Sequence, residues 1–280
     1  MREIDVSVIT AKISELCIDA NCNLNSDIYC ALQRGEKNDE SPVGRDILSG
    51  MIQNADIAKE KHMPICQDTG MAIFFIDIGQ DVHFTGGNLT DAVNEGVRQG
   101  YKKGYLRKSV VADPVLRSNT GDNTPAVIHY NIVPGENVKI TFMPKGFGSE
   151  NMGGVKMLKP SDGVEGIIDF VIKTVETAGP NPCPPIVVGV GIGGSMEKAA
   201  LLSKQALARS IDSSNPKKYY ADLENILLEK INALGIGPQG FGGNTTALGV
   251  NIETFPTHIA GMPVAVTISC HVTRHAEVII

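Results

Sequence analysis

The sequence predicts a mixed α/β fold in which helices pack around partly antiparallel sheets, with glycine-rich loops at the site. Apolar residues at a 3–4 spacing alternate along the chain with short apolar runs that are typical of strands. Two of these runs flank a turn sequence, as in a β-hairpin. The 30 glycines are about one and a half times the usual share and concentrate in loops. We expect residues 1–280 to form a single domain with a helical N-terminal segment over about 1–62.

The N-terminal segment is predicted to be helical. Residues 3–34 show the aliphatic spacing of helices, and Cys17 and Cys30 fit their apolar faces because unpaired cysteine is usually buried. Another helix is expected to begin at Ser41-Pro42 and to stop near Met63-Pro64.

The middle of the chain alternates strands and helices. Residues 71–79 read as a strand buried on both faces, because both alternating sets are apolar. A helix over 90–103 is expected to be capped by Thr90-Asp91. The apolar segments around Pro134-Gly135-Glu136-Asn137 predict a β-hairpin. A further helix is expected over 162–178, with Ser161 as its N-cap.

The C-terminal part is predicted to add strands around two helices. The segment over 184–194 reads as a strand that runs into a glycine turn, and an amphipathic helix over 195–209 follows it. A polar connector separates it from a helix over 220–234. Two strands are expected over 245–256 and 262–270. The sequence does not determine the order of the strands.

Composition excludes several classes of function. The net charge of -6 and the lack of a basic tract argue against nucleic acid as a partner. No apolar run approaches the roughly 20 residues that a membrane helix needs. The N-terminus lacks the apolar core of a secretion signal, so we expect a cytoplasmic protein that is not bound to membranes.

Six cysteines divide into a close N-terminal trio and three distant residues, Cys66, Cys183 and Cys270. The distant three each lie at the end of a predicted strand, and strand ends can meet at one sheet edge. Three thiolates can hold a [4Fe–4S] cluster and leave one iron without a protein ligand, whereas electron-transfer clusters usually have four. The alternative, three unrelated core thiols, stays open on spacing alone.

Polar loops supply candidates for binding an acidic substrate. Arg107, Arg117 and the loop over 145–154 offer guanidinium and backbone N–H groups, which suit carboxylates. A single arginine of this kind is equally compatible with a surface ion pair. His258 lies between two apolar segments and can be structural, while His271 and His275 can bind metal or orient the Cys270 loop.

A glycine motif indicates a different activity. Gly189–Gly194 matches G-x-G-x-x-G between a predicted strand and helix, which is the context of a dinucleotide site in an NAD-dependent dehydrogenase. Asp212 is in range for the ribose, but no apolar strand leads to it. The same turn can instead hold a substrate carboxylate at the helix N-terminus.

Seven segments together resemble the alpha subunit of the class I fumarase and tartrate dehydratase family. They are CQDTG at 66–70, LRKSVVADP at 106–114, RSNTGDNTPA at 117–126, KGFGSENM at 145–152, NPCPP at 181–185, GIGPQGFGGNTTALG at 235–249, and PTHIAGMPVAV at 256–266 followed by Cys270. The similarity covers nearly the whole chain and is weakest over 1–60.

The resemblance implies that this chain hydrates fumarate to malate, with dehydration of tartrate as the alternative. It implies a [4Fe–4S] cluster on Cys66, Cys183 and Cys270. It further implies a set of substrate-binding residues, of which Asp68 and His258 are expected to be catalytic: Gln67, Asp68, Arg107, Gly148 and His258.

The resemblance also implies a partner. Other members of the family carry a second domain after this region, and this chain ends soon after Cys270. We therefore expect a separate beta subunit in an α2β2 assembly. Two alternatives remain, the dehydrogenase above and a non-catalytic electron-transfer subunit.

Overall fold

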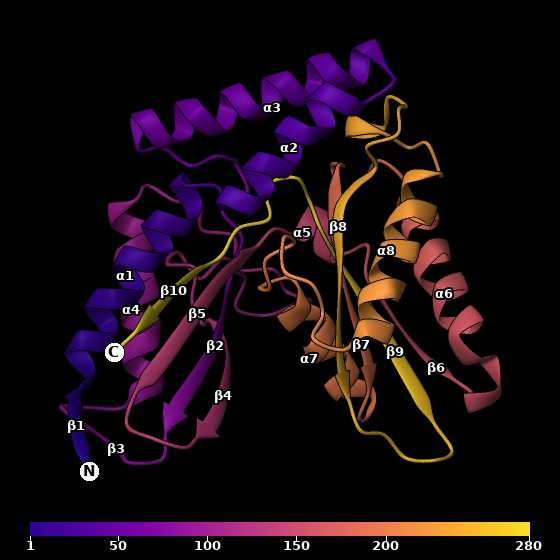
Figure 1. The fold of residues 1–280 in the computed structure, drawn as a ribbon. Helices are drawn as coiled ribbons and strands as arrows, with labels where there is room; N and C mark the ends of the chain where they lie inside the picture. The colour runs from indigo at the N-terminus through magenta and orange to yellow at the C-terminus, as the bar shows by residue number, and fades with distance from the viewer. The chain divides into compact units, whose positions relative to one another are not determined.

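The computed structural model describes residues 1–280, which form two compact units (Figure 1). Unit 1 comprises Met1–Leu24, Ala55–Phe147 and Arg274–Ile280. Unit 2 comprises Asn25–Asn54 and Gly148–Thr273. Each unit has a four-stranded mixed sheet and a hydrophobic core of its own, which confirms the predicted mixed α/β class.

In unit 1, two helices cover one face of the sheet. The strands lie in the order β10 (Ala276–Ile279), β5 (Val138–Lys145), β2 (Met71–Gly79) and β4 (Val127–Val133). Helices α1 (Val6–Cys22) and α4 (Leu89–Lys103) bury their apolar faces against Phe74 of β2 and Phe142 of β5. Strands β1 (Arg2–Asp5) and β3 (Val82–Thr85) form a separate parallel pair.

The predicted hairpin between β4 and β5 is wrong, because β2 lies between them. β2 pairs in parallel with β4 and antiparallel with β5. The connection between β4 and β5 passes the end of β2, where the Gly79 N–H donates to the Asn137 carbonyl at 2.8 Å. A side chain at Gly79 would bring its Cβ within 2.4 Å of the Gly135 carbonyl oxygen. The glycine therefore permits a crossing that the turn sequence does not reveal.

The segment over 3–34 that was predicted to be helical contains one strand and two helices. β1 precedes α1, and Asp5 caps α1 by accepting from the Ser7 N–H at 2.9 Å. Asn23–Asn25 separate α1 from α2 (Ser26–Asn38). Cys17 is fully buried as expected, but Cys30 is exposed, so its predicted core role is wrong.

Two other helices test the predicted boundaries. Helix α3 (Pro42–Lys61) agrees with its predicted start and end. Helix α4 is capped by Asn88, whose side chain accepts from the N–H groups of Thr90 and Asp91, so the Thr90-Asp91 cap is wrong. These two residues occupy the first turn instead.

In unit 2, helices cover both faces of the sheet (Figure 1). The strands lie in the order β6 (Gly154–Leu158), β9 (Met262–Ser269), β7 (Ile186–Gly193) and β8 (Ala247–Phe255). Helices α6 (Gly163–Ala178) and α8 (Lys218–Asn232) pack on one face and α7 (Met196–Ala206) on the other. The short helix α5 (Phe147–Glu150) precedes β6.

The predicted N-cap of α6 is also wrong. Pro160–Asp162 form a single 3-10 turn, and α6 begins after it at Gly163. Asp162 occupies the cap position and its carboxylate turns back to accept from the Lys159 N–H at 2.8 Å. Ser161 therefore lies within the preceding turn, where proline at the first position favours a short helix.

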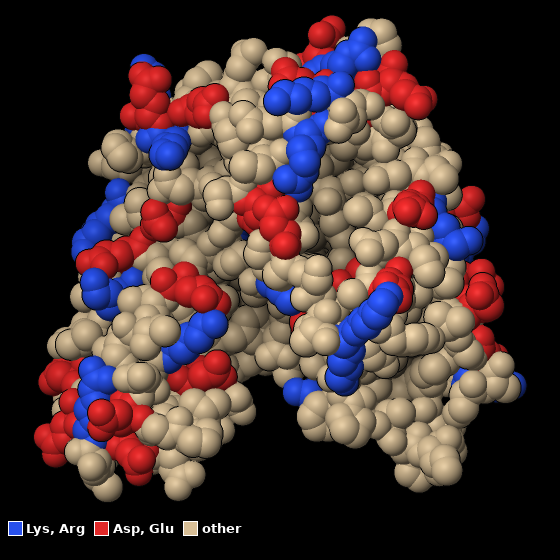
Figure 2. Space-filling view, in the orientation of Figure 1, with Lys and Arg blue, Asp and Glu red and all other residues tan.

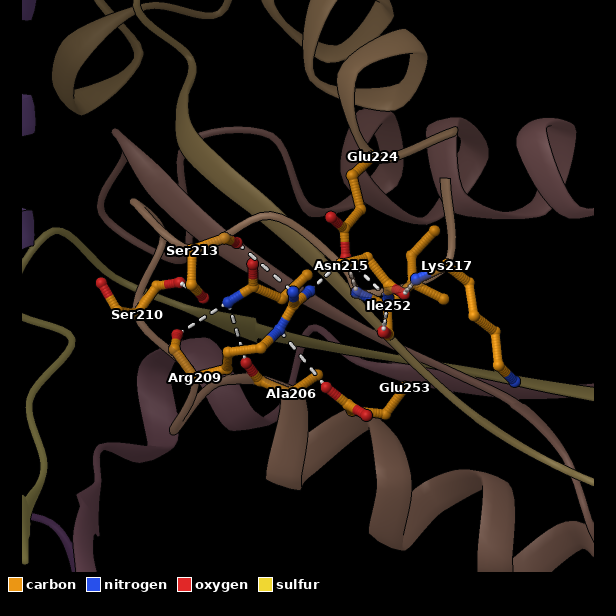
Figure 3. Close-up of polar contacts among 10 residues, drawn as sticks. Ala206, Arg209, Ser210, Ser213, Asn215, Lys217, Glu224, Ile252 and Glu253 are labelled. Carbon is orange, nitrogen blue, oxygen red and sulfur yellow. Dashed lines mark hydrogen bonds and ion pairs between the residues drawn. The ribbon is translucent and has the colours of Figure 1, made fainter. Parts of the chain in front are cut away.

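The outer edge of β8 is covered by side chains (Figure 3). The N–H of Ile252 donates to Glu224 Oε1 at 2.7 Å, and its carbonyl accepts from Asn215 Nδ2 at 2.8 Å. Arg209 forms ion pairs with Glu224 and with Glu253, the latter at 3.3 Å. These contacts satisfy backbone groups that would otherwise leave an open strand edge.

Charged groups of both signs are interspersed on the face shown in Figure 2. The view agrees with the modest net charge of -6 and with the absence of a basic tract in the sequence. None of the helices is long and apolar enough to cross a bilayer.

Candidate functional site

The strand register of unit 2 brings Cys183 and Cys270 to one edge of its sheet. β7 and β9 are antiparallel, and Val187 near the start of β7 pairs with Ser269 at the end of β9. Cys183 precedes β7 and Cys270 directly follows β9. Both prediction and structure therefore place these two thiols at strand ends, and the register shows that the ends coincide.

His271 ties the two cysteine segments together. Its backbone N–H donates to the Cys183 carbonyl at 3.4 Å, and its ring Nδ1 lies 3.0 Å from the same oxygen. Because a carbonyl can only accept, this contact assigns the Nδ1 proton to the His271 ring. The geometry gives His271 an orienting role in this loop.

Cys183 adopts an uncommon backbone conformation. Its φ is 57°, in the left-handed region that residues other than glycine seldom occupy. Cys183 is exposed and Cys270 is half-buried, whereas Cys17 is fully buried. Burial raises the pKa of the Cys17 thiol far above its ordinary value, which makes it a poor metal ligand. The accessible pair is better suited to ligation.

Gly148 lies beside the Cys183 segment. A Cβ added at Gly148 would lie 3.9 Å from the Asn181 carbonyl oxygen, two positions before Cys183. Unit 2 thus brings one predicted substrate-binding residue to the loop that carries a predicted metal ligand. No side chain at Gly148 covers the backbone there.

In unit 1, the loop over 66–70 lies at the edge where β2 begins and β5 ends. Met71 pairs with Lys145, so residues before β2 and after β5 are neighbours. Both carboxylate oxygens of Asp68 accept backbone N–H groups, from Gly70 and from Phe147, each at 3.0 Å. These bonds hold the carboxylate in one orientation.

Arg107 lies beside the same loop. The Thr69 hydroxyl donates to the Arg107 carbonyl at 3.0 Å, and Arg107 is exposed. The predicted residues Cys66, Gln67, Asp68 and Arg107 are thus neighbours within unit 1. Cys66 and Asp68 are half-buried and Gln67 is exposed.

Two buried polar side chains that the sequence did not single out hold the loop over 66–70 in place. The Tyr101 hydroxyl donates to the carbonyls of Thr69 and Gly70 at 2.8 and 3.0 Å. Burial raises the pKa of Tyr101 well above its ordinary value, so the hydroxyl remains a donor. Asn123 donates to Gly70 as well and accepts from the Ser109 N–H at 2.7 Å.

Arg274 is a further residue that the sequence left unassigned. Its side chain is buried and donates to the Asp68 carbonyl at 2.9 Å. It also donates to Asn21 Oδ1 at 3.3 and 3.1 Å. Its position four residues after Cys270 hinted at a role near the site, but its partners are distant in the sequence.

The predicted residues are not all in one unit. Cys66 belongs to unit 1, and Cys183 and Cys270 belong to unit 2. Neither unit by itself gathers three or more His, Cys, Asp or Glu side chains at one point. His258 follows β8, whose end pairs with the end of β7 at Gly193 and Phe255. His258 therefore lies at the opposite end of the strands from Cys183 and Cys270.

Close packing explains the glycine motif of β7. Gly189 and Gly191 face α7, and a Cβ at either would approach a helix carbonyl, of Ser203 or Ala199, to about 2 Å. The N-terminal turn of α7 is occupied by Glu197, which accepts from the Ser195 hydroxyl. The motif thus serves the contact between helix and strand, and an acidic side chain stands where a phosphate would bind.

Comparisons with known proteins find relatives that align with nearly the whole chain. The family model described as fumarate hydratase (Fumerase) matches residues 10–279. A protein of Methanocaldococcus jannaschii is 42% identical over 274 residues, 96% of each chain, and carries the provisional name of an L(+)-tartrate dehydratase alpha subunit. Proteins named L(+)-tartrate dehydratase subunit alpha in Escherichia coli (strain K12) and Shigella sonnei are 34% identical over 279 residues, 98% of this chain and 91% of theirs.

These matches define an enzyme of the hydro-lyase class, which adds or removes water. Within that class, the chain belongs to the fumarate hydratase (Fumerase) family.

Proposed function

We propose that this chain is the alpha subunit of a two-subunit iron–sulfur hydro-lyase that converts fumarate to malate. The observation that carries the proposal is the register of β7 and β9, which brings two accessible thiols to one sheet edge. Thiolates are the ligands that iron–sulfur clusters require. The family match over residues 10–279 supports the reaction class.

Cys66, Cys183 and Cys270 would hold a [4Fe–4S] cluster. The fit rests on the chemistry of the donors, because these three cysteines are exposed or half-buried. Cys17 and Cys22, by contrast, are buried, and burial raises the pKa of both thiols. When bound, such a cluster with three protein ligands supplies a Lewis-acidic iron for the substrate hydroxyl and one carboxylate.

The protein's own residues would orient the substrate. The exposed Arg107 guanidinium suits bidentate binding of a carboxylate, and the Gln67 amide and the backbone at Gly148 offer further donors. Fixing both ends of a small dicarboxylate places the reacting carbon in one geometry.

Asp68 and His258 are the proposed catalytic groups. The two backbone N–H bonds keep the Asp68 carboxylate from rotating, so it can face one substrate atom. In His258, Nδ1 accepts from the Ala260 N–H at 3.1 Å, which leaves the proton of the neutral ring on Nε2. His258 Nε2 is thus available to donate a hydrogen bond to a substrate oxygen.

A separate beta subunit is part of the proposal. The relatives are named as alpha subunits, which supports a partner chain for this one, with α2β2 as the simplest assembly. The same names support L(+)-tartrate as a second candidate substrate, since they specify L(+)-tartrate dehydratase. Tartrate differs from malate by one hydroxyl, and the beta subunit can supply the discriminating contact.

The test is anaerobic turnover by the co-expressed pair of subunits, with fumarate and with both tartrates. Cys183→Ser should abolish the brown cluster absorbance and the activity, whereas Cys30→Ser, also an exposed cysteine of unit 2, should keep both. A colourless wild-type complex, or a fully active Cys183→Ser complex, would contradict the proposal.

A further inference from the structure

The segment that carries Cys183 has few backbone donors of its own. Residues 182, 184 and 185 are prolines, which have no backbone N–H group. The N–H of Cys183 donates to the Pro180 carbonyl at 3.0 Å. Further backbone hydrogen bonds of this segment must therefore go to its carbonyl oxygens, and the donors must come from other parts of the chain.

Two carbonyls of this segment each accept two hydrogen bonds from a single residue. The Cys183 carbonyl accepts from the backbone N–H of His271 at 3.4 Å and from its ring Nδ1 at 3.0 Å. The Pro184 carbonyl accepts from the backbone N–H of Gln239 at 2.8 Å and from its side-chain Nε2 at 3.0 Å. A carbonyl oxygen has two lone pairs, so both are used in each case.

The same arrangement recurs at the other cysteine. The Cys270 carbonyl accepts from the backbone N–H of Thr273 at 2.9 Å and from its hydroxyl at 2.8 Å. His271 directly follows Cys270, so the residue that binds the Cys183 carbonyl belongs to the segment that carries the second thiol. All of these residues lie in unit 2. The two cysteine backbones are thus joined to each other and fixed on both sides.

Two residues of this network have an uncommon backbone. Cys183 has a φ of 57°, and Gln239, in the 3-10 turn of Pro238–Gly240, has a φ of 52°. Residues other than glycine keep this conformation where the surrounding contacts determine it, and such residues concentrate at functional sites. The doubly bonded carbonyls supply contacts of that kind.

We propose that His271, Gln239 and Thr273 are positioning residues that fix the backbones of Cys183 and Cys270 before metal arrives, so that the two thiols form a prearranged pair of ligands. This rests on the proposed function, in which these thiols bind the cluster. A prearranged pair needs no further ordering on binding, which strengthens the binding of iron. His271 acts through its Nδ1–H and is not itself a ligand.

Two replacements of His271 test the role of its Nδ1–H. Asparagine places its amide nitrogen as far from the backbone as Nδ1, whereas glutamine places it one bond farther out, nearer to the position of Nε2. Complexes of wild type, His271→Asn and His271→Gln with the beta subunit are prepared anaerobically, and iron release to excess ferrozine is followed. His271→Gln should release iron about 10-fold faster than wild type, and His271→Asn should stay within about threefold of it.

A replacement of Gln239 tests the second donor independently. Gln239→Met keeps the size of the side chain but removes the Nε2 donor, so the Pro184 carbonyl retains only its backbone bond and iron release should again be faster. Gln99→Met is the matched control, because the Gln99 side chain bonds Glu95 within α4. It should release iron at the wild-type rate. Iron-free complexes of all variants are also unfolded in urea, and His271→Asn and His271→Gln should have nearly the same midpoint.

The remaining outcomes are distinct. If both His271 variants release iron at the wild-type rate, or both release it equally fast, the Nδ1–H does not position Cys183, and the inference is wrong while the proposed function stands. A difference in iron release that follows a difference in the urea midpoint reflects general stability and also overturns the inference. A wild-type complex that holds no iron contradicts the proposed function, and the inference with it.

Discussion

The guanidinium of Arg274 donates to the backbone carbonyl of Asp68 at 2.9 Å, although 206 positions separate the two residues. The same side chain donates to Asn21 Oδ1, so one buried cation joins α1, the loop before β2 and the segment before β10. The Asp68 carboxylate accepts hydrogen bonds from two backbone N–H groups, and its backbone carbonyl accepts one from Arg274. The loop of Cys66–Gly70 is therefore positioned by residues from three distant parts of the chain.

Replacing this cation tests its positioning role. Arg274→Met should lower the free energy of unfolding by about 2–4 kcal/mol, because it leaves the buried Asn21 and Asp68 oxygens without their charged donor. Denaturant unfolding measures the loss. Arg34→Met is the matched control, since Arg34 makes an exposed pair with Asp212 that contributes at most about 1 kcal/mol. Equal effects of the two variants would show that Arg274 is not a structural link.

A second prediction concerns acid stability. Burial of Asp122 acts to raise its pKa, but hydrogen bonds from Thr124 and Arg98 outweigh it and lower the pKa to about 2. A carboxyl whose folded pKa is lowered stabilises the fold above its ordinary pKa of 3.8 and loses that effect as the pH falls toward 2. Asp122→Asn should therefore cost about 1–2 kcal/mol at pH 6 and nearly nothing at pH 2. Urea unfolding at both pH values measures this, and a cost independent of pH would contradict it.

How far the sequence predicted the fold depended on whether a feature was local. Helix α3 agreed with prediction, because its apolar spacing lies between Pro42 and Pro64, and strand β2 agreed because its apolar run is continuous. The β4–β5 hairpin failed, since the inserted strand comes from earlier in the chain. The predicted core position of Cys30 was wrong, because the sequence does not show which face of a helix packs against the rest of the protein.

The candidate site shows the same division. Strand ends predicted that Cys183 and Cys270 would lie at an edge, but only the antiparallel register shows that it is the same edge. The register also separates His258 from them, which no spacing in the sequence could indicate. Gly189 and Gly191 matched a nucleotide-binding motif, but in the structure they allow α7 to pack closely against β7. Both a nucleotide site and a close helix–strand contact require residues without a side chain, so the sequence alone cannot distinguish them.

A third prediction compares two glycines that have nearly the same φ angle but different surroundings. Gly70 and Gly121 have φ values of 76° and 79°. A Cβ at Gly70 would lie 2.6 Å from the Lys145 nitrogen, whereas nothing lies within 4 Å of one at Gly121. Gly121→Ala should cost only the left-handed strain, about 1–2 kcal/mol. Gly70→Ala should cost clearly more and displace the loop over 66–70, so thermal unfolding of both variants separates strain from collision. Equal melting temperatures would mean that the contact with β5 is relaxed at no cost.

A fourth prediction tests the covered edge of β8. Glu224 is buried, accepts from the Ile252 N–H and pairs with Arg209. Glu224→Gln keeps the size and an acceptor oxygen but removes the charge, which leaves Arg209 with Glu253 as its remaining acidic partner. Burial raises the pKa of Glu253, so its carboxyl group is protonated more readily and is a weaker partner for Arg209 than Glu224 is.

We therefore expect Glu224→Gln to lower the free energy of unfolding by about 1–3 kcal/mol. Asp222→Asn on the same helix is the control, because its pair with Lys218 is exposed and should contribute less than about 0.5 kcal/mol. Hydrogen exchange adds a local measurement, since the Ile252 amide should exchange faster in Glu224→Gln than in the control. If both variants unfold at the same denaturant concentration and Ile252 stays protected, the edge is stabilised by β7 alone and the side-chain cover is dispensable.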